Sequence, residues 1–538
     1  MLLDGHKVEK GHTIETDVCI IGGGPAGITL AREFANKNFN VVLLESGGEK
    51  FRHPPQWLQI AYNVGRPYFD IVFTRHRMLG GSTYKWYGLC RPLDSIDFEE
   101  RSWVPYSGWP INKETLDPYY DRASAYFQLP TTEFSTQNFL EPDQAEIQNN
   151  VIETKVYQFS PPTDFREQYL HETAGAGNIS IIYHSNVTKL ESNETGTKVI
   201  EVKVATLTGR KFQVSARVFI IACGGIENAR LLLVSNSRVK PGLGNQHDLV
   251  GRFFNEHPHT FYAQILDTEN NRFRGIYKSL DYKIDAKNQP PTGVFSLRQE
   301  IMRKNKLLNS CAILVNRPDY KLGTDYNSLT GVSLSRLAEL FSHNSFIKAT
   351  TWRDLKNIIF DPATGLRILK NQIENKISPK GSITLRFMIE AAPNPDSRVT
   401  LSEKKDFLGV NRINLDWRLS EQDLVSYINY NKVLVSELRT LGFSVNEIKF
   451  EPDETGWPYA MTAAKHHLGA TRMHQEPQKG VVDSNCKVHG MENLYIAGSS
   501  VFPTSGCANP TLTIIALTLR LADHIKQTMD NMPSLTMH

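Results

Sequence analysis

The sequence predicts an α/β protein, α+β overall, in which a nucleotide-binding domain with a parallel sheet is joined to a domain with an antiparallel sheet. Three observations carry this prediction. A glycine-rich turn follows a short apolar run near the N-terminus. Strand-like segments separated by turn residues occupy the middle of the chain. A short strand, a glycine and a long apolar helix come near the C-terminus.

The first observation is the segment 16–48, which has the pattern of a strand, a tight turn, a helix and a second strand. Gly22, Gly24 and Gly27 form G-x-G-x-x-G between the strand and the helix. Gly22 turns the chain, Gly24 lets the backbone approach a pyrophosphate, and Gly27 lets the helix pack on the sheet. The pattern is typical of a Rossmann-like dinucleotide site, and the alternative is a chance glycine cluster on a strand–helix turn.

An acidic residue completes this motif. The second strand, 41–44, ends at Glu45, whose carboxylate can accept both hydroxyls of an adenosine ribose. The motif by itself does not separate NAD from FAD.

Composition excludes several other classes of protein. The 538 residues exceed one ordinary core, and 60 basic against 57 acidic residues leave +3, too little to favour nucleic acid as a partner. The six cysteines form no CxxC pair, so neither a disulfide framework nor a metal site is indicated, and a reducing, cytoplasmic location is expected. The start of the chain has no apolar signal segment, and the run 512–525 is too short and too charged for a membrane span.

Two further glycine-containing turns follow along the first half. The loop 77–91 contains Gly80 and Gly81, which permit close backbone approach, and Ser82, which offers a hydrogen-bond donor. Residues 179–222 have the pattern of strands and lead through Gly224 into a helix. A surface loop and a plain strand–helix connection are the alternatives for these two turns.

The middle of the chain predicts an antiparallel meander. Strand patterns at 382–391, 398–403 and 411–419 are joined by turn sequences. A capping box at Ser420 and a stop at Gly442 predict a helix over 421–441. Residues 318–375 are weakly patterned, and a helical spacing there indicates a core-facing stripe formed by Leu337, Leu340 and Phe341.

The C-terminal part contains a strand that ends at Gly498 and Ser499, followed by a loop and a helix. Asn509 is expected to cap this helix, with Pro510 at its first position. Upstream, two histidines stand side by side in Lys465–Met473, "KHHLGATRM". A histidine suits general base catalysis because its pKa lies near neutrality, although a histidine beside a glycine is more often structural.

Taken in order, these pieces resemble the glucose–methanol–choline (GMC) oxidoreductases, which are FAD-dependent oxidases and dehydrogenases of alcohols and sugars. The resemblance covers Asp17–Gly48, Arg77–Tyr120, Cys223–His259 and Ala464–Ile525, with weaker matches in "APNPDSRVTLS" and "LGVNRINLDWRLS". Within the family, "GCANPTLTIIAL" is most similar to the pyranose-oxidase and sugar-dehydrogenase branch.

The resemblance implies a role for each motif. His466, with Leu468 and Gly469 completing the family pattern, would be the base, and Asn509 would hold the substrate oxygen. His467 would face protein or the cavity wall. The resemblance adds FAD contacts from Gly80, Gly81, Ser82, Trp86, Val187, Gly224, Gly498, Ser499, Pro510 and Thr511. Lys85 stands where some pyranose oxidases attach flavin to a histidine, so FAD is expected to be non-covalent. Gly498 replaces a frequent Asp, so its contact would be made by backbone.

The expected activity is oxidation of a CH–OH group of a sugar or glycoside. A non-sugar alcohol enzyme and a non-catalytic flavin-binding subunit are the alternatives. The expected electron acceptor is oxygen, a quinone or a redox partner, and a small or haem subunit is a further candidate partner. We expect an FAD-binding domain from residues 12–260 and 455–538, with a substrate domain and lid-like insert in 261–454.

Overall fold

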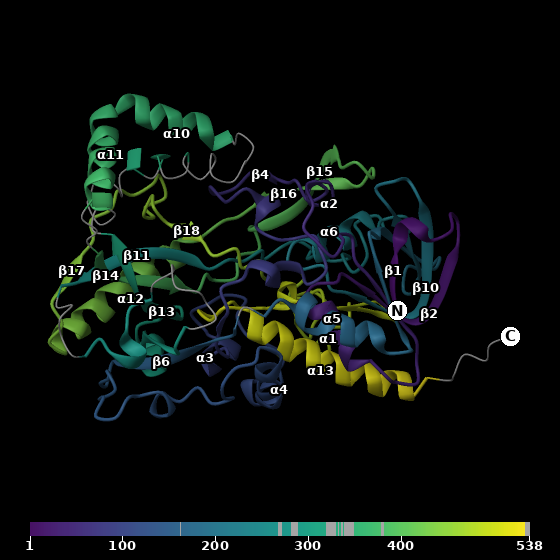
Figure 1. Ribbon diagram of the computed structural model, residues 1–538, viewed down its shortest axis with the longest axis horizontal. Coiled ribbons are helices and arrows are strands. Elements are labelled where there is room, and N and C mark those ends of the chain that lie inside the picture. The colour runs from purple at the N-terminus through teal and green to yellow at the C-terminus, as the bar shows by residue number, and fades with distance from the viewer. Residues whose placement is uncertain are drawn as a thin grey trace.

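A computed structural model describes residues 1–161, 163–266, 272–280, 289–318, 330–331, 333–334, 337, 349–377 and 381–532. The fold is the mixed α/β arrangement that the sequence predicts. In Figure 1, β1, β2 and β10 lie near the N-terminus, and β11, β13 and β14 lie toward the other end of the long axis. The C-terminal helix α13 (Thr511–Asp530) runs along the part of the molecule that contains the N-terminal strands. Among the described residues, no helix has both the length and the apolar character needed to cross a membrane.

The first sheet is mainly parallel. Within the described residues its spatial order is β1 (Leu2–Asp4), β7 (Ile179–Tyr183), β3 (Val41–Leu44), β2 (Thr13–Ile21), β10 (Lys211–Ile221), β9 (Val199–Ala205) and β8 (Asn186–Ser192), with β19 (Leu494–Ile496) beside β10. Parallel pairing joins β1, β7, β3, β2, β10 and β19. Strand β9 pairs antiparallel with both β10 and β8. Parallel pairing brings the carboxyl ends of β2, β3, β10 and β19 to one edge, just before Gly22, Glu45, Gly224 and Gly498.

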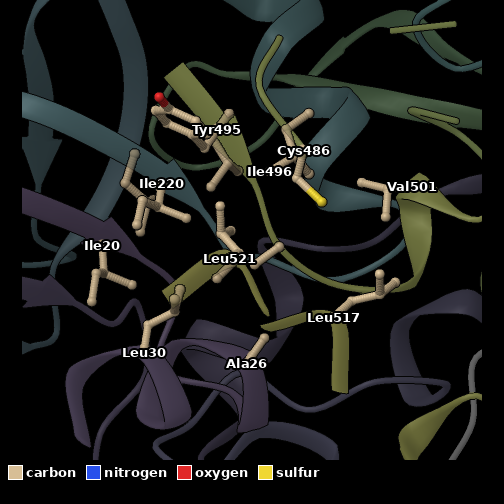
Figure 2. Close-up of a cluster of buried hydrophobic side chains, with 14 of the residues drawn as sticks. Ile20, Ala26, Leu30, Ile220, Cys486, Tyr495, Ile496, Val501, Leu517 and Leu521 are labelled. Atoms are coloured by element: carbon tan, nitrogen blue, oxygen red, sulfur yellow. The ribbon is translucent and has the colours of Figure 1, made fainter. Parts of the chain in front are cut away.

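Apolar side chains bind the two ends of the chain together. Figure 2 shows Ile20 of β2, Ile220 of β10 and Ile496 of β19 gathered near Leu30 of α1 (Pro25–Glu33) and Leu521 of α13. These side chains are almost completely buried. Burial of one such side chain contributes about 1.5–3 kcal/mol, so the C-terminal segment is an integral part of the core around the first sheet.

The second sheet is antiparallel. Its order within the described residues is β17 (Val445–Glu447), β11 (Pro258–Ile265), β14 (Gly381–Ile389), β13 (Ser310–Pro318), β12 (Thr292–Leu297), β6 (Ile152–Phe159) and β5 (Leu89–Cys90), with β18 (Thr462–Ala463) beside β11. The predicted helix is α12 (Glu421–Thr440), with the expected capping box between Ser420 and Asp423. Tyr430 anchors it to the sheet, because its hydroxyl accepts the Leu297 N–H at 2.8 Å.

The predicted meander is wrong in one part. β15 (Arg398–Lys405) and β16 (Asn411–Asp416) form a hairpin, but they pair with β4 (Tyr62–Asn63) in a separate three-stranded sheet within the described residues. A local hairpin pattern does not specify which sheet it joins, and the open edge of β16 is taken by β4. The domain division stays a prediction, although β5 and β6 fall within residues 12–260 and yet belong to the second sheet.

The remaining helices are α2 (His53–Trp57), α3 (Ser95–Phe98), α4 (Lys113–Tyr126), α5 (Phe165–Gly175), α6 (Glu227–Val234), α7 (Gln299–Lys304), α10 (Ala349–Phe360) and α11 (Pro362–Ile377). Figure 1 shows α10 and α11 at the end of the molecule far from the N-terminus. Leu340 and Phe341 of the expected helical stripe lie outside the described residues.

Candidate functional site

A cavity of about 810 Å³ opens at the edge where the strands of the first sheet end, and residues of the second sheet line its other side. The sequence-predicted residues that line it are Gly22, Gly24, Glu45, Gly81, Ser82, Trp86, Val187, Gly224, His466, Gly498, Ser499, Asn509, Pro510 and Thr511. Gly27 and Gly80 are not in its wall. The fold therefore brings together segments from both ends of the chain in one cavity.

Gly27 and Gly80 pack against the backbone of the glycine turn, at Gly22 and Gly23. A Cβ on Gly27 would lie 1.8 Å from the carbonyl oxygen of Gly22, so only glycine lets α1 approach the turn this closely. The Gly80 N–H donates to the carbonyl oxygen of Gly23 at 2.9 Å, and Gly80 has a φ of +86°. The tight packing explains why these two glycines lie outside the cavity.

The turns fit a pyrophosphate. Gly22 has a φ of +110°, and Gly24 directly precedes α1. A Cβ added to Gly24 or to Gly224 would meet no atom within 4 Å. Both positions therefore present bare backbone to open space, and at Gly24 this space adjoins the positive end of a helix dipole.

Glu45 is buried beside the glycine turn, at 5% exposure. Its carboxylate accepts the N–H groups of Gly23 at 2.8 Å and of Gly47 at 2.7 Å. The Ser46 hydroxyl donates to the same carboxylate at 3.1 Å. An ionised carboxylate has about four acceptor positions, so one stays available for a ribose hydroxyl. The contacts with backbone hold the carboxylate in place at the cavity wall.

His466 and Asn509 face each other at the wall of the cavity. Nδ2 of Asn509 lies 3.4 Å from Nε2 of His466, and Oδ1 of Asn509 has no hydrogen-bond partner among the described residues. His466 comes from the segment before β19, and Asn509 comes from the loop before α13. An unpartnered amide oxygen beside a histidine is a suitable setting for a substrate hydroxyl.

The expected role of Asn509 as a helix cap is wrong. Pro510 is the N-cap residue of α13, and no side chain caps this helix. Asn509 is one residue too early to cap it, so its amide is available to His466 instead. Its Asn–Pro sequence led to the cap interpretation, because this pattern usually marks a helix start.

His466 also has a partner on its other side. Its Nδ1 lies 2.9 Å from Nδ1 of His257, and Nε2 of His257 lies 3.2 Å from the carbonyl oxygen of Ser505. The Glu256 carboxylate accepts the N–H of His466 at 2.8 Å and that of His257 at 2.9 Å. The buried Glu256 side chain therefore holds the backbone N–H groups of both histidines in place.

His467 also lines the cavity, but its ring packs against aromatic side chains. Its ring packs near Tyr68 and Phe254, with centroids 6.0 and 5.9 Å away, and it is 7% exposed. The carbonyl oxygen of His467 accepts the Ser499 hydroxyl at 2.6 Å, and a Cβ on Gly225 would lie 2.2 Å from that oxygen. This histidine thus packs tightly against the glycine turn at the end of β10.

Burial sets the protonation of this region. Desolvation lowers the pKa of His466 well below its ordinary value, and the charges of His257, His467 and Arg386 act in the same direction. Burial lowers the pKa of His257 to about 4 and that of His467 to about 3. Burial raises the pKa of Glu256 to about 7, against the opposing effect of its hydrogen bonds. All three histidines are neutral near pH 7.

Sequence reasoning gave no role to Glu256, His257, His259 or Arg386. Arg386 lies on β14, where its guanidinium contacts Nδ1 of His259 on β11, and both residues line the cavity beside His466. The stretch Asn255–His259, "NEHPH", lies in one of the segments that resemble the GMC oxidoreductases. Its acid and paired histidines were the available signal, but the contact with His466 depends on tertiary structure.

Two family models match parts of the chain. Residues 17–247 match the model of the FAD dependent oxidoreductases, and residues 393–518 match that of the GMC oxidoreductases. The chain is 23% identical over 586 residues to a 2-methyl-1,2-propanediol dehydrogenase of Mycolicibacterium austroafricanum, covering 95% of each chain. It is 24% identical over 596 residues to the fructose dehydrogenase large subunit of Gluconobacter japonicus, covering 96% of this chain and 98% of that protein.

A solved structure has the same fold. A formate oxidase superposes with a TM-score of 0.56 at 18% identity, covering 97% of this chain and 100% of the other. The cavity contains a turn that fits a dinucleotide, and the family matches cover both the glycine turn and the segment with His466 and Asn509. The C-terminal part of the chain matches the GMC oxidoreductases, and the chain is an FAD-dependent oxidoreductase that acts on alcohols.

Proposed function

We propose that this enzyme oxidises a CH–OH group of a sugar or glycoside to a carbonyl, with His466 as general base. The observation that carries the proposal is the 3.4 Å approach of Asn509 Nδ2 to His466 Nε2 at the wall of the cavity. The relationship to a fructose dehydrogenase subunit and the likeness of "GCANPTLTIIAL" to the sugar-oxidising branch support the choice of substrate.

The residues present fit FAD. Gly22, Gly24 and the first turn of α1 would hold the pyrophosphate, and Glu45 would accept a ribose hydroxyl. The loop from Gly81 to Trp86 and the backbone at Gly498, Ser499, Pro510 and Thr511 would contact the flavin ring system. We also propose that residues 12–260 and 455–538 build this half, while 261–454 supply most of the substrate side.

The chemistry divides between two side chains. When bound, FAD supplies the acceptor for the hydride that leaves the carbinol carbon. Nε2 of His466 takes the hydroxyl proton as that hydride leaves, and the Asn509 amide holds the oxygen without competing for the proton. The low pKa of His466 keeps it neutral, so it is ready to accept a proton.

A non-sugar alcohol is the second candidate substrate, favoured by the relationship to a diol dehydrogenase. An anaerobic screen of sugars, glycosides and simple alcohols for bleaching of the flavin absorbance separates the two. Bleaching by a sugar or glycoside at the lowest concentration supports the proposal, and bleaching by simple alcohols alone contradicts it. His466→Gln, with equal flavin content, is the matched control and should bleach far more slowly.

The flavin is proposed to be non-covalent because Lys85 replaces an attachment histidine. Lys85 is exposed and extends over the Tyr84 ring, 5.4 Å from its centroid. Acid precipitation should release free FAD into the supernatant. Flavin retained in the protein pellet would contradict this expectation and would direct attention to His76, which also lines the cavity.

The electron acceptor is proposed to be oxygen, a quinone or a redox protein, and the "large subunit" relative makes a small or haem-bearing partner subunit a further proposal. Re-oxidation of the substrate-reduced enzyme by air and by a soluble quinone distinguishes an oxidase from a dehydrogenase. Faster recovery of the flavin absorbance with quinone than with air identifies a dehydrogenase.

A further inference from the structure

His257 is a buried histidine whose ring contacts the ring of His466. His257 lies immediately before β11 and is 1% exposed. Its two ring nitrogens have different partners, Nδ1 of His466 at 2.9 Å and the carbonyl oxygen of Ser505 at 3.2 Å. A neutral imidazole has one N–H donor and one bare acceptor nitrogen, so these partners fix its tautomer.

The Ser505 carbonyl decides the first proton. A carbonyl oxygen only accepts hydrogen bonds, so Nε2 of His257 carries the hydrogen. Burial lowers the pKa of His257 to about 4, although the carbonyl groups of Ser505 and Gly506 oppose the shift. The ring is therefore neutral near pH 7, and its Nδ1 is bare.

The bare Nδ1 of His257 then decides the second proton. Two bare nitrogens 2.9 Å apart would repel each other, so Nδ1 of His466 must donate. Since His466 is also neutral, its Nε2 is bare. That nitrogen faces the Nδ2 donor of Asn509, which is consistent with the same assignment from the opposite side.

We propose that His257 is a positioning residue that keeps His466 in the tautomer whose Nε2 is free to accept the substrate proton. This inference rests on the proposed function of His466 as base. In a histidine without such a partner the proton divides between the two nitrogens, and molecules protonated at Nε2 cannot act. The hydrogen bonds that run from the Ser505 carbonyl through His257 to His466 remove that inactive fraction. Glu256 fixes the two backbone segments that carry the rings.

The resting tautomer can be measured directly. Nitrogen-15 spectra of the FAD-loaded protein, labelled in histidine and assigned by loss of signals in His466→Gln, should show His466 protonated at Nδ1 and bare at Nε2. Protonation of His466 at Nε2 would overturn the proposal. This measurement requires no turnover and does not depend on the identity of the substrate.

Two substitutions of His257 test its role in the reaction. His257→Leu removes the acceptor, so His466 should become a mixture of tautomers and anaerobic flavin reduction should slow about ten- to a hundredfold, with KM little changed. His257→Asn returns an acceptor oxygen near the former Nδ1 and should restore most of the rate and the Nδ1–H signal. His467→Leu removes a buried histidine that takes no part in these hydrogen bonds, and it should leave the His466 tautomer unchanged. Flavin content and thermal midpoint establish that each variant is folded.

The outcomes separate this proposal from the proposed function. If His466→Gln keeps a normal rate of flavin reduction, His466 is not the base and the proposed function fails. If His466→Gln is slow but His257→Leu keeps both the rate and the tautomer, only the role of His257 is overturned. Equal loss in His257→Leu and His257→Asn, with the Nδ1–H signal retained in both, also overturns it, because the loss would then be unrelated to the tautomer.

Discussion

The two ends of the cavity are built in different ways. At the nucleotide end, Gly22, Gly24 and Glu45 come from one short segment, and the site consists mainly of backbone presented by glycine. At the histidine end, the groups are side chains drawn from three distant segments around residues 257, 466 and 509. A turn that presents backbone to a phosphate forms from neighbouring residues, whereas the meeting of three distant side chains requires the whole fold. Variants at the two ends should therefore fail differently.

The largest effect should come from the nucleotide end. Gly24→Val should abolish FAD binding, because a side chain there occupies the space that a pyrophosphate needs. The protein should nevertheless fold, since a Cβ at Gly24 meets no atom within 4 Å and its φ of −77° suits any residue. The ratio of flavin to protein absorbance and the thermal midpoint test the two statements separately.

Gly27→Val is the matched control for that variant. A Cβ on Gly27 would lie 1.8 Å from a backbone oxygen of the turn, so this variant should lose folded protein as well as flavin. Normal flavin content in a folded Gly24→Val protein would show that the turn does not hold the pyrophosphate.

The histidine end should lose rate and keep its cofactor. His466→Ala should slow anaerobic flavin reduction by about a hundredfold to ten-thousandfold, the usual loss for a general base. His467→Ala should cost far less in rate and should act mainly on stability, because its ring packs against Tyr68 and Phe254. Stopped-flow flavin reduction at saturating substrate compares them. A dead His467 variant beside a near-normal His466 variant would reverse the assignment.

Asn509→Asp should have a smaller effect. The side chain does not cap α13, so the helix should be unaffected, but the variant loses the amide donor toward His466 and gains a negative charge. Loss of one hydrogen bond worth about 0.5–1.5 kcal/mol predicts a reduction of about two- to tenfold in the rate of flavin reduction. Asn509→Gln is the control that keeps an amide at neutral charge. Unchanged reduction in both variants would show that Asn509 only packs.

The smallest effect should be that of pH. A histidine with an ordinary pKa of about 6.5 would be roughly three-quarters protonated at about pH 6 and would lose base activity there. Because burial lowers the pKa of His466 well below that value, the neutral base persists as pH falls, and flavin reduction should stay nearly level from about pH 8 to about pH 6. A residual step near pH 7 that disappears in Glu256→Gln would belong to Glu256, whose pKa burial raises to about 7. A fall centred on the ordinary histidine value in both proteins would contradict the prediction.

Local patterns predicted the glycine turn, the strands around it, the capped helix α12 and the paired sheets of the fold class. Each depends on neighbours a few residues apart, such as Ser420 with Asp423, so the sequence carries the whole signal. The same local logic misread Asn509, because Asn before Pro usually marks a helix start, whereas here the helix begins one residue later and the amide faces His466.

By itself the sequence determined the dinucleotide turn and the succession of strands and helices, and its resemblance to the GMC oxidoreductases predicted roles for His466 and Asn509. Only the tertiary structure decided that β15 and β16 join β4 in a separate sheet. It also decided that His257 contacts His466 on one side and the carbonyl oxygen of Ser505 on the other. The physical reason is the range of the contacts. Turns and caps close within a few residues, whereas His257 and His466 are separated by 209 positions and meet only when the edges of the two sheets enclose one cavity.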